Sequence, residues 1–201
     1  MTRVVLIRPG STDYDEQNRI QGTLDIPLNS RGAEEASTTA EGLRAVSLNR
    51  VFSCAGASAG ETARVIGKKL GIRCRKLDKL QNLNHGHWQG LQVEEVRRKH
   101  PKVFRQWCEQ PTTVCPPGGE TVSDAYDRVA RVLKPLLKRH RDEVFGLVVP
   151  EPLASVIRCY LLRLDPSKLW EEGASDGRWR VIEWNEEPPV QDSSPQGPVK
   201  P

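Results

Sequence analysis

A short stretch near the amino terminus, residues 4–12 (VVLIRPGST), contains the first side chains that could do chemistry. An apolar, β-branched run ends in a glycine turn that has an arginine before it and two hydroxyl residues after it, which is typical of a phosphate-binding loop. Arg8, Ser11 and Thr12 could therefore bind an anion. The residue after Arg8 is Pro9, which has neither a nucleophilic side chain nor a backbone N–H. The loop resembles an anion cradle without a nucleophile.

The four histidines and five cysteines offer few other reactive groups. The cysteines form no CxxC pair and their spacing does not fit a zinc site, so we expect free, mostly buried thiols, no metal and no cofactor. His85 and His87 lie in a loop just before Trp88 and could replace a missing nucleophile, although packing or surface roles are commoner for such residues. Ser11, Ser53 and Ser58 belong to no Ser-His-Asp or nucleophile-elbow pattern.

Strand and helix patterns alternate along the chain, and the elements that they predict would position these residues. Strands are predicted at 3–7, 50–55, 72–77, 144–149 and 178–184, and helices at 31–46, 59–71, 93–110, 120–143 and 152–164. We expect Ser30 to cap the first helix, Gly71 to close the second, Pro101 to divide the third and Pro135 to kink the fourth.

This alternation predicts an α/β fold of three layers, a doubly wound and mostly parallel sheet between helices. Ligands in such sheets bind beyond the carboxyl ends of the strands. We therefore expect residues 8–12, 53–57 and 150–152 to meet at one rim, where a ligand would sit.

The composition of the 201-residue chain fits one domain. With 30 basic and 26 acidic residues, the net charge of +4 suits small anionic molecules but does not indicate nucleic acid. No stretch is long enough to span a membrane and the amino terminus lacks a signal-peptide pattern, so we expect no membrane association and a cytoplasmic protein. The proline-rich segment 187–201 is expected to be a disordered tail.

Several ordered motifs resemble those of the histidine phosphatase superfamily, in its phosphoglycerate mutase branch. The opening Arg8-Pro9-Gly10-Ser11-Thr12 corresponds to the Arg-His-Gly-x-Thr of the family, and Arg19-Ile20-Gln21-Gly22, Asp25, Pro27 and Leu28 follow at the family spacing. Further matching segments are LQNLNHGHWQGL (80–91), PPGGET (116–121), VVPEPLASVIR (148–158) and WRVIEWNE (179–186). The resemblance covers about residues 1–186 and implies a phosphoglycerate mutase-like domain with a small helical cap at about 80–120.

The resemblance implies a phosphohistidine mechanism, in which most of the required side chains are replaced here. In the family a histidine attacks the phosphoryl group, two arginines and a second histidine hold its oxygens, and an acid protonates the leaving group. Arg8 matches the first arginine, whereas the other four positions are Pro9, Ser58, Asn82 and Glu151. We therefore interpret the chain as a catalytically inactive member, a pseudoenzyme, with a binding, regulatory or scaffolding role.

The replaced site leaves a set of candidate ligand-binding residues, namely Arg8, Ser11, Thr12, Gln21, Gly22 and Glu151. We expect Arg8 and Glu151 to form an internal ion pair that fills the former phosphate position. The expected partner is an unidentified protein or a small anionic ligand, and a homodimer is an open alternative. The alternative function is a phosphatase or phosphomutase with residual or relocated activity on a small phosphoester.

Overall fold

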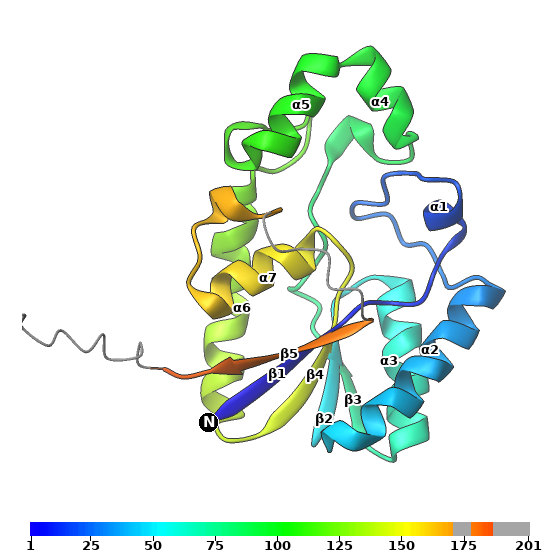
Figure 1. Ribbon diagram of the computed structural model, residues 1–201, viewed down its shortest axis with the longest axis vertical. Coiled ribbons are helices and arrows are strands. Elements are labelled where there is room, and N and C mark those ends of the chain that lie inside the picture. The colour runs from blue at the N-terminus through cyan, green and yellow to red at the C-terminus, as the bar shows by residue number, and fades with distance from the viewer. Residues whose placement is uncertain (171–177, 187–201) are drawn as a thin grey trace, which may run out of the picture.

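The computed structural model describes residues 1–170 and 178–186, and within them five strands form one sheet (Figure 1). The strands are β1 (Thr2–Ile7), β2 (Arg50–Ser53), β3 (Arg73–Lys76), β4 (Val144–Val148) and β5 (Trp179–Trp184). β4 and the second part of β1, Val4–Ile7, consist of apolar residues, as is typical of strands that helices cover on both faces. All five strands lie where the sequence predicts them.

The strand order β3-β2-β4-β1-β5 makes the sheet mostly parallel. β4 is parallel to both β1 and β2, β2 is parallel to β3, and β5 runs antiparallel to β1 at the edge. Val148 pairs with Ile7 on one side and with Ser53 on the other. The three central strands therefore end at the same level, and the segments that follow them meet at one rim, as the predicted α/β fold requires.

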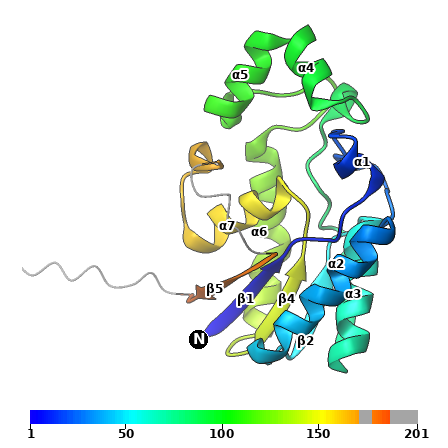
Figure 2. The same cartoon turned by 45° about the vertical axis from the view of Figure 1, so that its right-hand side comes forward.

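Two pairs of helices complete the three layers, as Figures 1 and 2 show. α2 (Ser30–Gly42) and α3 (Ala57–Leu70) cover one face of the sheet, and α6 (Val122–Arg139) and α7 (Leu153–Leu162) cover the other. The buried residues of α6 recur at helical spacing and face the core: Val122, Ala125, Val129, Leu133 and Leu137. α3 ends at Gly71, whose φ of 67° is left-handed, as predicted.

A cap formed within residues 80–120 lies over the carboxyl rim of the sheet. It contains α4 (Val93–Lys99), α5 (Pro101–Glu109) and the short 3-10 turns Gly86–Trp88 and Pro111–Thr113. The predicted break before Pro101 is confirmed, because α4 ends at Lys99 and α5 begins at the proline. A one-turn helix, α1 (Asp13–Glu16), follows the loop after β1, and the remaining 3-10 turns are Leu43–Val46 and Pro166–Lys168.

Two local predictions were wrong. The N-cap of α2 is Asn29 rather than Ser30, because the Asn29 side chain accepts a hydrogen bond from Gly32 N and the helix begins one residue earlier. The cysteines are free but not mostly buried: Cys54 and Cys159 are buried, whereas Cys74, Cys108 and Cys115 are exposed.

Two further expectations from the sequence stay predictions. Pro135 lies inside α6, which continues to Arg139, and the kink itself stays a prediction. The predicted tail 187–201 lies outside the described residues. Among the helices of the described chain, none is both long and apolar enough to cross a membrane.

Candidate functional site

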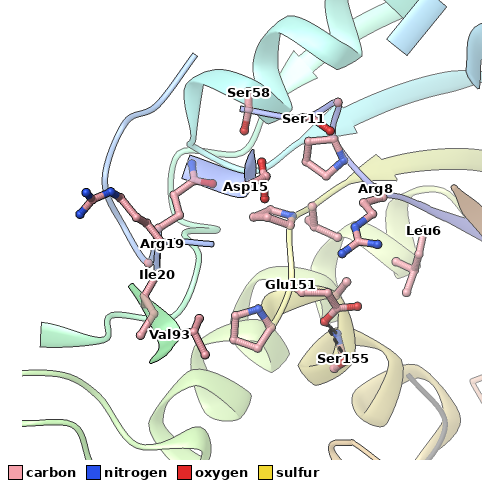
Figure 3. Close-up of a pocket in the computed structure, with 18 of the residues that line it drawn as sticks. Leu6, Arg8, Ser11, Asp15, Arg19, Ile20, Ser58, Val93, Glu151 and Ser155 are labelled. Atoms are coloured by element: carbon pink, nitrogen blue, oxygen red, sulfur yellow. Dashed lines mark hydrogen bonds between the residues drawn. The ribbon is translucent and has the colours of Figure 1, made fainter. Parts of the chain in front are cut away.

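A cavity of about 1310 Å³ opens at the carboxyl rim, between the sheet and the cap (Figure 3). Its walls come from the loop after β1, the start of α3, the turn between β4 and α7, and the cap. It brings together most of the residues predicted from the sequence, namely Arg8, Pro9, Ser11, Gln21, Gly22, Ser58 and Glu151. Thr12 and Asn82 are buried, 1% and 7% exposed, and do not line it. Thr12 instead caps α1.

Protein acceptors bind every backbone N–H that the loop 8–12 possesses. The donor and acceptor pairs are Arg8 N with Arg178 O (2.8 Å), Gly10 N with Thr62 Oγ1 (3.0 Å), Ser11 N with Glu35 Oε2 (2.8 Å) and Thr12 N with Asp15 Oδ2 (2.8 Å). Pro9, which is buried, has no N–H to offer. Phosphate-binding loops hold their ligand through such groups, so this loop has no unpaired amide for a phosphate.

Two glycines let the loop lie directly on the first turn of α2. A Cβ on Gly10 would stand 2.1 Å from Gly32 O, and a Cβ on Gly32 would stand 2.0 Å from Ser11 O. Both distances are far below van der Waals contact, so larger residues would push the loop away from the helix. This close approach brings Glu35, one turn further along α2, within reach of Ser11.

Glu35 lies against the loop at Ser11, a contact that no pattern in the sequence indicates. Its carboxylate accepts hydrogen bonds from Ser11 N at 2.8 Å and Ser11 Oγ at 2.7 Å, and it forms ion pairs with Arg31 and Arg178. Burial alone would raise the pKa of Glu35, but the Ser11 hydrogen bonds and the Arg178 charge outweigh it and hold the pKa below its usual value. The loop thus binds a carboxylate of the protein itself.

Glu151 follows β4 and caps α7. Its Oε2 accepts hydrogen bonds from Ser155 N at 3.2 Å and Ser155 Oγ at 2.8 Å (Figure 3). Glu151 precedes the N-cap residue Pro152, and a carboxylate at this end of a helix is favourable because the N-terminal amides carry partial positive charge. The expected Arg8–Glu151 ion pair is not formed in the described chain, because the Glu151 carboxylate is turned to its own helix. The pocket is open between the two side chains.

Asn82 has a structural role at the position where the resemblance implies the acid. Its Oδ1 accepts hydrogen bonds from Leu83 N at 2.9 Å and Leu153 N at 3.3 Å, and its Nδ2 donates to Glu151 O at 3.3 Å. The side chain therefore ties the segment 80–91 to the start of α7. An amide with these partners holds the turn in place and supplies no proton at neutral pH.

A second network that the sequence did not indicate supports the same segment. Arg128 of α6 pairs with Glu120 at 2.6 Å and donates to Gln81 O at 2.8 Å. Glu120 Oε1 also accepts from Asn84 N at 2.9 Å. The segment that carries Asn82 is thus fixed from α6 as well as from α7. The segment PPGGET ends in Thr121, which caps α6.

Ser58, Gln21 and Gly22 complete the polar lining. Ser58 is 2% exposed in the first turn of α3, where its backbone N donates to Ile26 O at 3.2 Å. Gln21 Nε2 donates to Leu24 O at 3.3 Å. Gly22 has a φ of 55° and lies against the Gln89 side chain, so a Cβ would be both strained and obstructed there. None of these groups supplies a second cation.

The cap side of the pocket is aromatic. Trp107 contacts His85, Trp88 and Trp170, with ring-centre distances of 5.3, 6.4 and 5.7 Å. Trp170 Nε1 donates to Trp107 O at 2.9 Å. His85 is 6% exposed, and its burial lowers its pKa to about 4, so the ring is neutral at neutral pH. We call His85, Trp88, Phe104, Trp107 and Trp170 the aromatic wall; all five line the cavity.

Comparisons with known proteins agree with this fold. Over 186 residues the chain is 32% identical to "Phosphoserine phosphatase 1" of Hydrogenobacter thermophilus, which covers 92% of this chain and 88% of that protein. It is 31% identical to "Phosphoglycerate mutase-like protein 4" of Arabidopsis thaliana, over 82% and 71% of the two chains. The solved structure of Bacillus stearothermophilus YhfR superimposes with a TM-score of 0.83 at 24% identity, over 92% and 93% of the chains, which shows the fold.

A vanadate complex of the mycobacterial glucosyl-3-phosphoglycerate phosphatase Rv2419c has a TM-score of 0.79 at 28% identity, and the match covers 91% of this chain and 98% of that one. A sequence model of the histidine phosphatase superfamily, branch 1, matches residues 4–193. This match extends over nearly the whole chain, from β1 past β5. The chain therefore belongs to the histidine phosphatase superfamily.

Proposed function

We propose that this chain is a catalytically inactive member of its superfamily and that its pocket serves binding, in a regulatory or scaffolding role. The observation that carries the proposal is the loop after β1. Pro9 has no nucleophilic atom, and the amides of the loop are already bound by protein acceptors. A phosphoryl group placed there would find neither an attacking group nor a backbone cradle.

The other replaced positions support the same conclusion. Glu151 places negative charge where a phosphoryl group would need a cation, and Asn82 is engaged in holding the start of α7. Ser58 is a small buried hydroxyl where a second arginine is implied by the resemblance. Transition-state charge on phosphoryl oxygens requires fixed cations, and removal of such groups lowers rates by orders of magnitude.

A phosphatase with relocated activity is the second candidate, and two observations favour it. The relatives carry names such as phosphoserine phosphatase and glucosyl-3-phosphoglycerate phosphatase. His85 lines the pocket as a neutral imidazole, which is the protonation state a nucleophile needs. His87 is exposed on the same loop. Residual turnover carried by either ring would make the chain an enzyme on a small phosphoester.

Turnover measurements separate the two candidates. The natural protein is assayed on a panel of phosphoesters, including p-nitrophenyl phosphate and O-phospho-L-serine, beside a variant combining Pro9→His, Ser58→Arg, Asn82→Glu and Glu151→His. We expect no turnover above background from the natural protein and measurable turnover from the restored variant. The Hydrogenobacter relative serves as the positive control for the assay, and circular dichroism checks that the variant is folded.

Turnover by the natural protein would contradict the proposal. Its loss in His85→Phe or in His87→Asn would then identify the ring that carries the phosphoryl group. If the natural protein shows no turnover, binding assays with ligands and partners come next.

A protein partner, a homodimer and a cytoplasmic location all remain part of the proposal. Size-exclusion chromatography with light scattering tests the homodimer directly.

A further inference from the structure

Two oppositely charged side chains face the pocket without contacting each other. Arg8 follows β1 and Glu151 follows β4, which are neighbouring parallel strands that end in register. Figure 3 shows the Arg8 guanidinium turned toward the side of the pocket that holds Glu151. In the part of the chain that the structure describes, this guanidinium has no hydrogen-bond or ion-pair partner, and Glu151 accepts its Ser155 bonds through Oε2, which leaves Oε1 for another donor.

The other arginines that line the cavity are engaged within the protein. Their partners are Glu35 for Arg31 and Arg178, Gly90 O for Arg19 and Leu169 O for Arg158, and Arg180 also has a protein partner. The carboxylate of Glu35 is held by the same ion pairs. Among the arginines that line the cavity in the described chain, Arg8 is thus the one whose guanidinium has no protein partner, and Glu151, at the end of the neighbouring strand, is a carboxylate outside any ion pair.

The aromatic wall adds an apolar surface to this pair of charges. Phe104 and Trp170 are half-buried, so part of each ring faces the cavity. Trp107 is held in place by its contacts with His85, Trp88 and Trp170, which keeps the wall ordered. A ligand that lies against Arg8, Glu151 and this wall would thus meet a cation, a carboxylate and an aromatic face.

We propose that the pocket binds a zwitterion, a free α-amino acid with an apolar side chain, whose carboxylate meets Arg8 and whose ammonium meets Glu151. A guanidinium binds a carboxylate through two parallel hydrogen bonds, and an ammonium has three donors for carboxylate oxygens. A phosphate dianion fits less well, because Glu151 repels it and the loop amides are engaged. This inference rests on the proposed function, in which the pocket binds rather than hydrolyses.

Calorimetric titration of the full chain with matched probes tests the charges of the ligand. L-phenylalanine carries both charges, its primary amide keeps only the ammonium, N-acetyl-L-phenylalanine keeps only the carboxylate, and phenyl phosphate is an anion with the same ring. We expect saturable binding of L-phenylalanine and at least about tenfold weaker binding of each of the other three, because one charged contact is lost in each case. Quenching of tryptophan emission gives a second readout, since phenylalanine itself emits little in that range.

Single substitutions test which side chains of the protein bind the two charges of the ligand. Arg8→Met is expected to weaken L-phenylalanine about tenfold or more while leaving the weak binding of its amide unchanged. Glu151→Gln keeps an oxygen that accepts from Ser155, so the fold is retained, and it is expected to weaken L-phenylalanine while leaving the N-acetyl compound unchanged. Glu16→Gln is the matched control inside the pocket, because Glu16 lines the cavity from α1, and Arg64→Met is the control on the exposed face of α3.

Three results would overturn the inference. They are equal binding of L-phenylalanine and its N-acetyl derivative, tighter binding of phenyl phosphate, and an absence of saturation by L-phenylalanine at millimolar concentration while the protein is folded. An equal loss in Glu16→Gln and Glu151→Gln would also contradict it, since net charge rather than position would then control binding. If the titrations contradict amino-acid binding but the natural protein shows no phosphoester turnover, the proposed function still stands. If the natural protein does turn over a phosphoester, the proposed function is refuted whatever the titrations give.

Discussion

The two sides of the pocket reach stability by different means. On the sheet side, polar groups bond to one another: Ser11, Glu35 and Arg178 form one network, and Glu151 caps its own helix. On the cap side, Trp88, Trp170 and the neutral His85 pack around Trp107. The sheet side thus holds carboxylates that the protein itself binds, while the cap side presents an aromatic surface to the cavity. These internal contacts do not fill the pocket.

The most destabilising change that we expect lies on the cap side of the pocket. Trp107→Ala removes a ring that is 9% exposed and contacts three other rings. Deletion of a buried aromatic side chain costs about 3–5 kcal/mol, because both burial and packing are lost. Urea denaturation followed by circular dichroism measures the free energy of unfolding. Arg105→Ala, an exposed position on the same helix, is the control and should change it by less than about 0.5 kcal/mol.

On the sheet side of the pocket, Glu35→Ala should cause the next largest loss of stability. This change leaves Ser11 N and Oγ without their acceptor and removes the partner of Arg178. The loss of a half-buried carboxylate with several charge-assisted partners should lower the free energy of unfolding by about 2–3 kcal/mol. Glu34→Ala, on the exposed face of the same turn, should cost less than about 0.5 kcal/mol. An equal effect of both changes would show that the Ser11 network does not stabilise the loop.

The pH dependence of stability separates the two sides without deleting a contact. His85 has a folded pKa of about 4 against 6.5 when unfolded, so the unfolded chain binds more protons between these values. Stability from the neutral ring is therefore complete above pH 6.5 and is lost as the pH falls toward 4. Between pH 7 and pH 5 the free energy of unfolding should fall by about 2 kcal/mol more in the natural protein than in His85→Phe.

Glu35 has the complementary pH range. Because its folded pKa lies below the usual 4.5, its contribution is present above pH 4.5 and is lost as the pH falls through the folded value. Measurements between pH 7 and pH 5 therefore report mainly the cap side. A slope in that range that is unchanged in His85→Phe would mean that the ring is not buried as neutral imidazole in solution.

The parts of the fold that could be predicted are those that a local pattern determines. The apolar runs of β1 and β4 and the terminal Gly71 of α3 indicate their elements without knowledge of the partners. The cap of α2 was misplaced because Asn29 and Ser30 are both good N-caps, and only the hydrogen bond to Gly32 N decides between them.

The sequence predicted where the residues of the candidate site lie, but not which groups they contact. Strand order places Arg8 and Glu151 at one rim, yet the sequence could not show that Ser155, in the first turn of the following helix, binds the carboxylate. Glu35 reads as an ordinary polar residue of an amphipathic helix. Its role depends on the close approach of Gly10 and Gly32, which is a feature of tertiary packing that no local pattern specifies.

The charge of Glu151 should contribute little to the stability of the fold. Glu151→Gln keeps an oxygen that accepts from Ser155 N and Oγ, so the free energy of unfolding should change by less than about 0.5 kcal/mol. Glu151→Ala removes the cap and should cost about 1 kcal/mol. A loss in Glu151→Gln as large as in Glu151→Ala would mean that the charge is needed by the helix. If only the alanine variant loses stability, the fold needs the cap and leaves the negative charge to act on what enters the pocket, in contrast to Glu35, whose charge the protein uses itself.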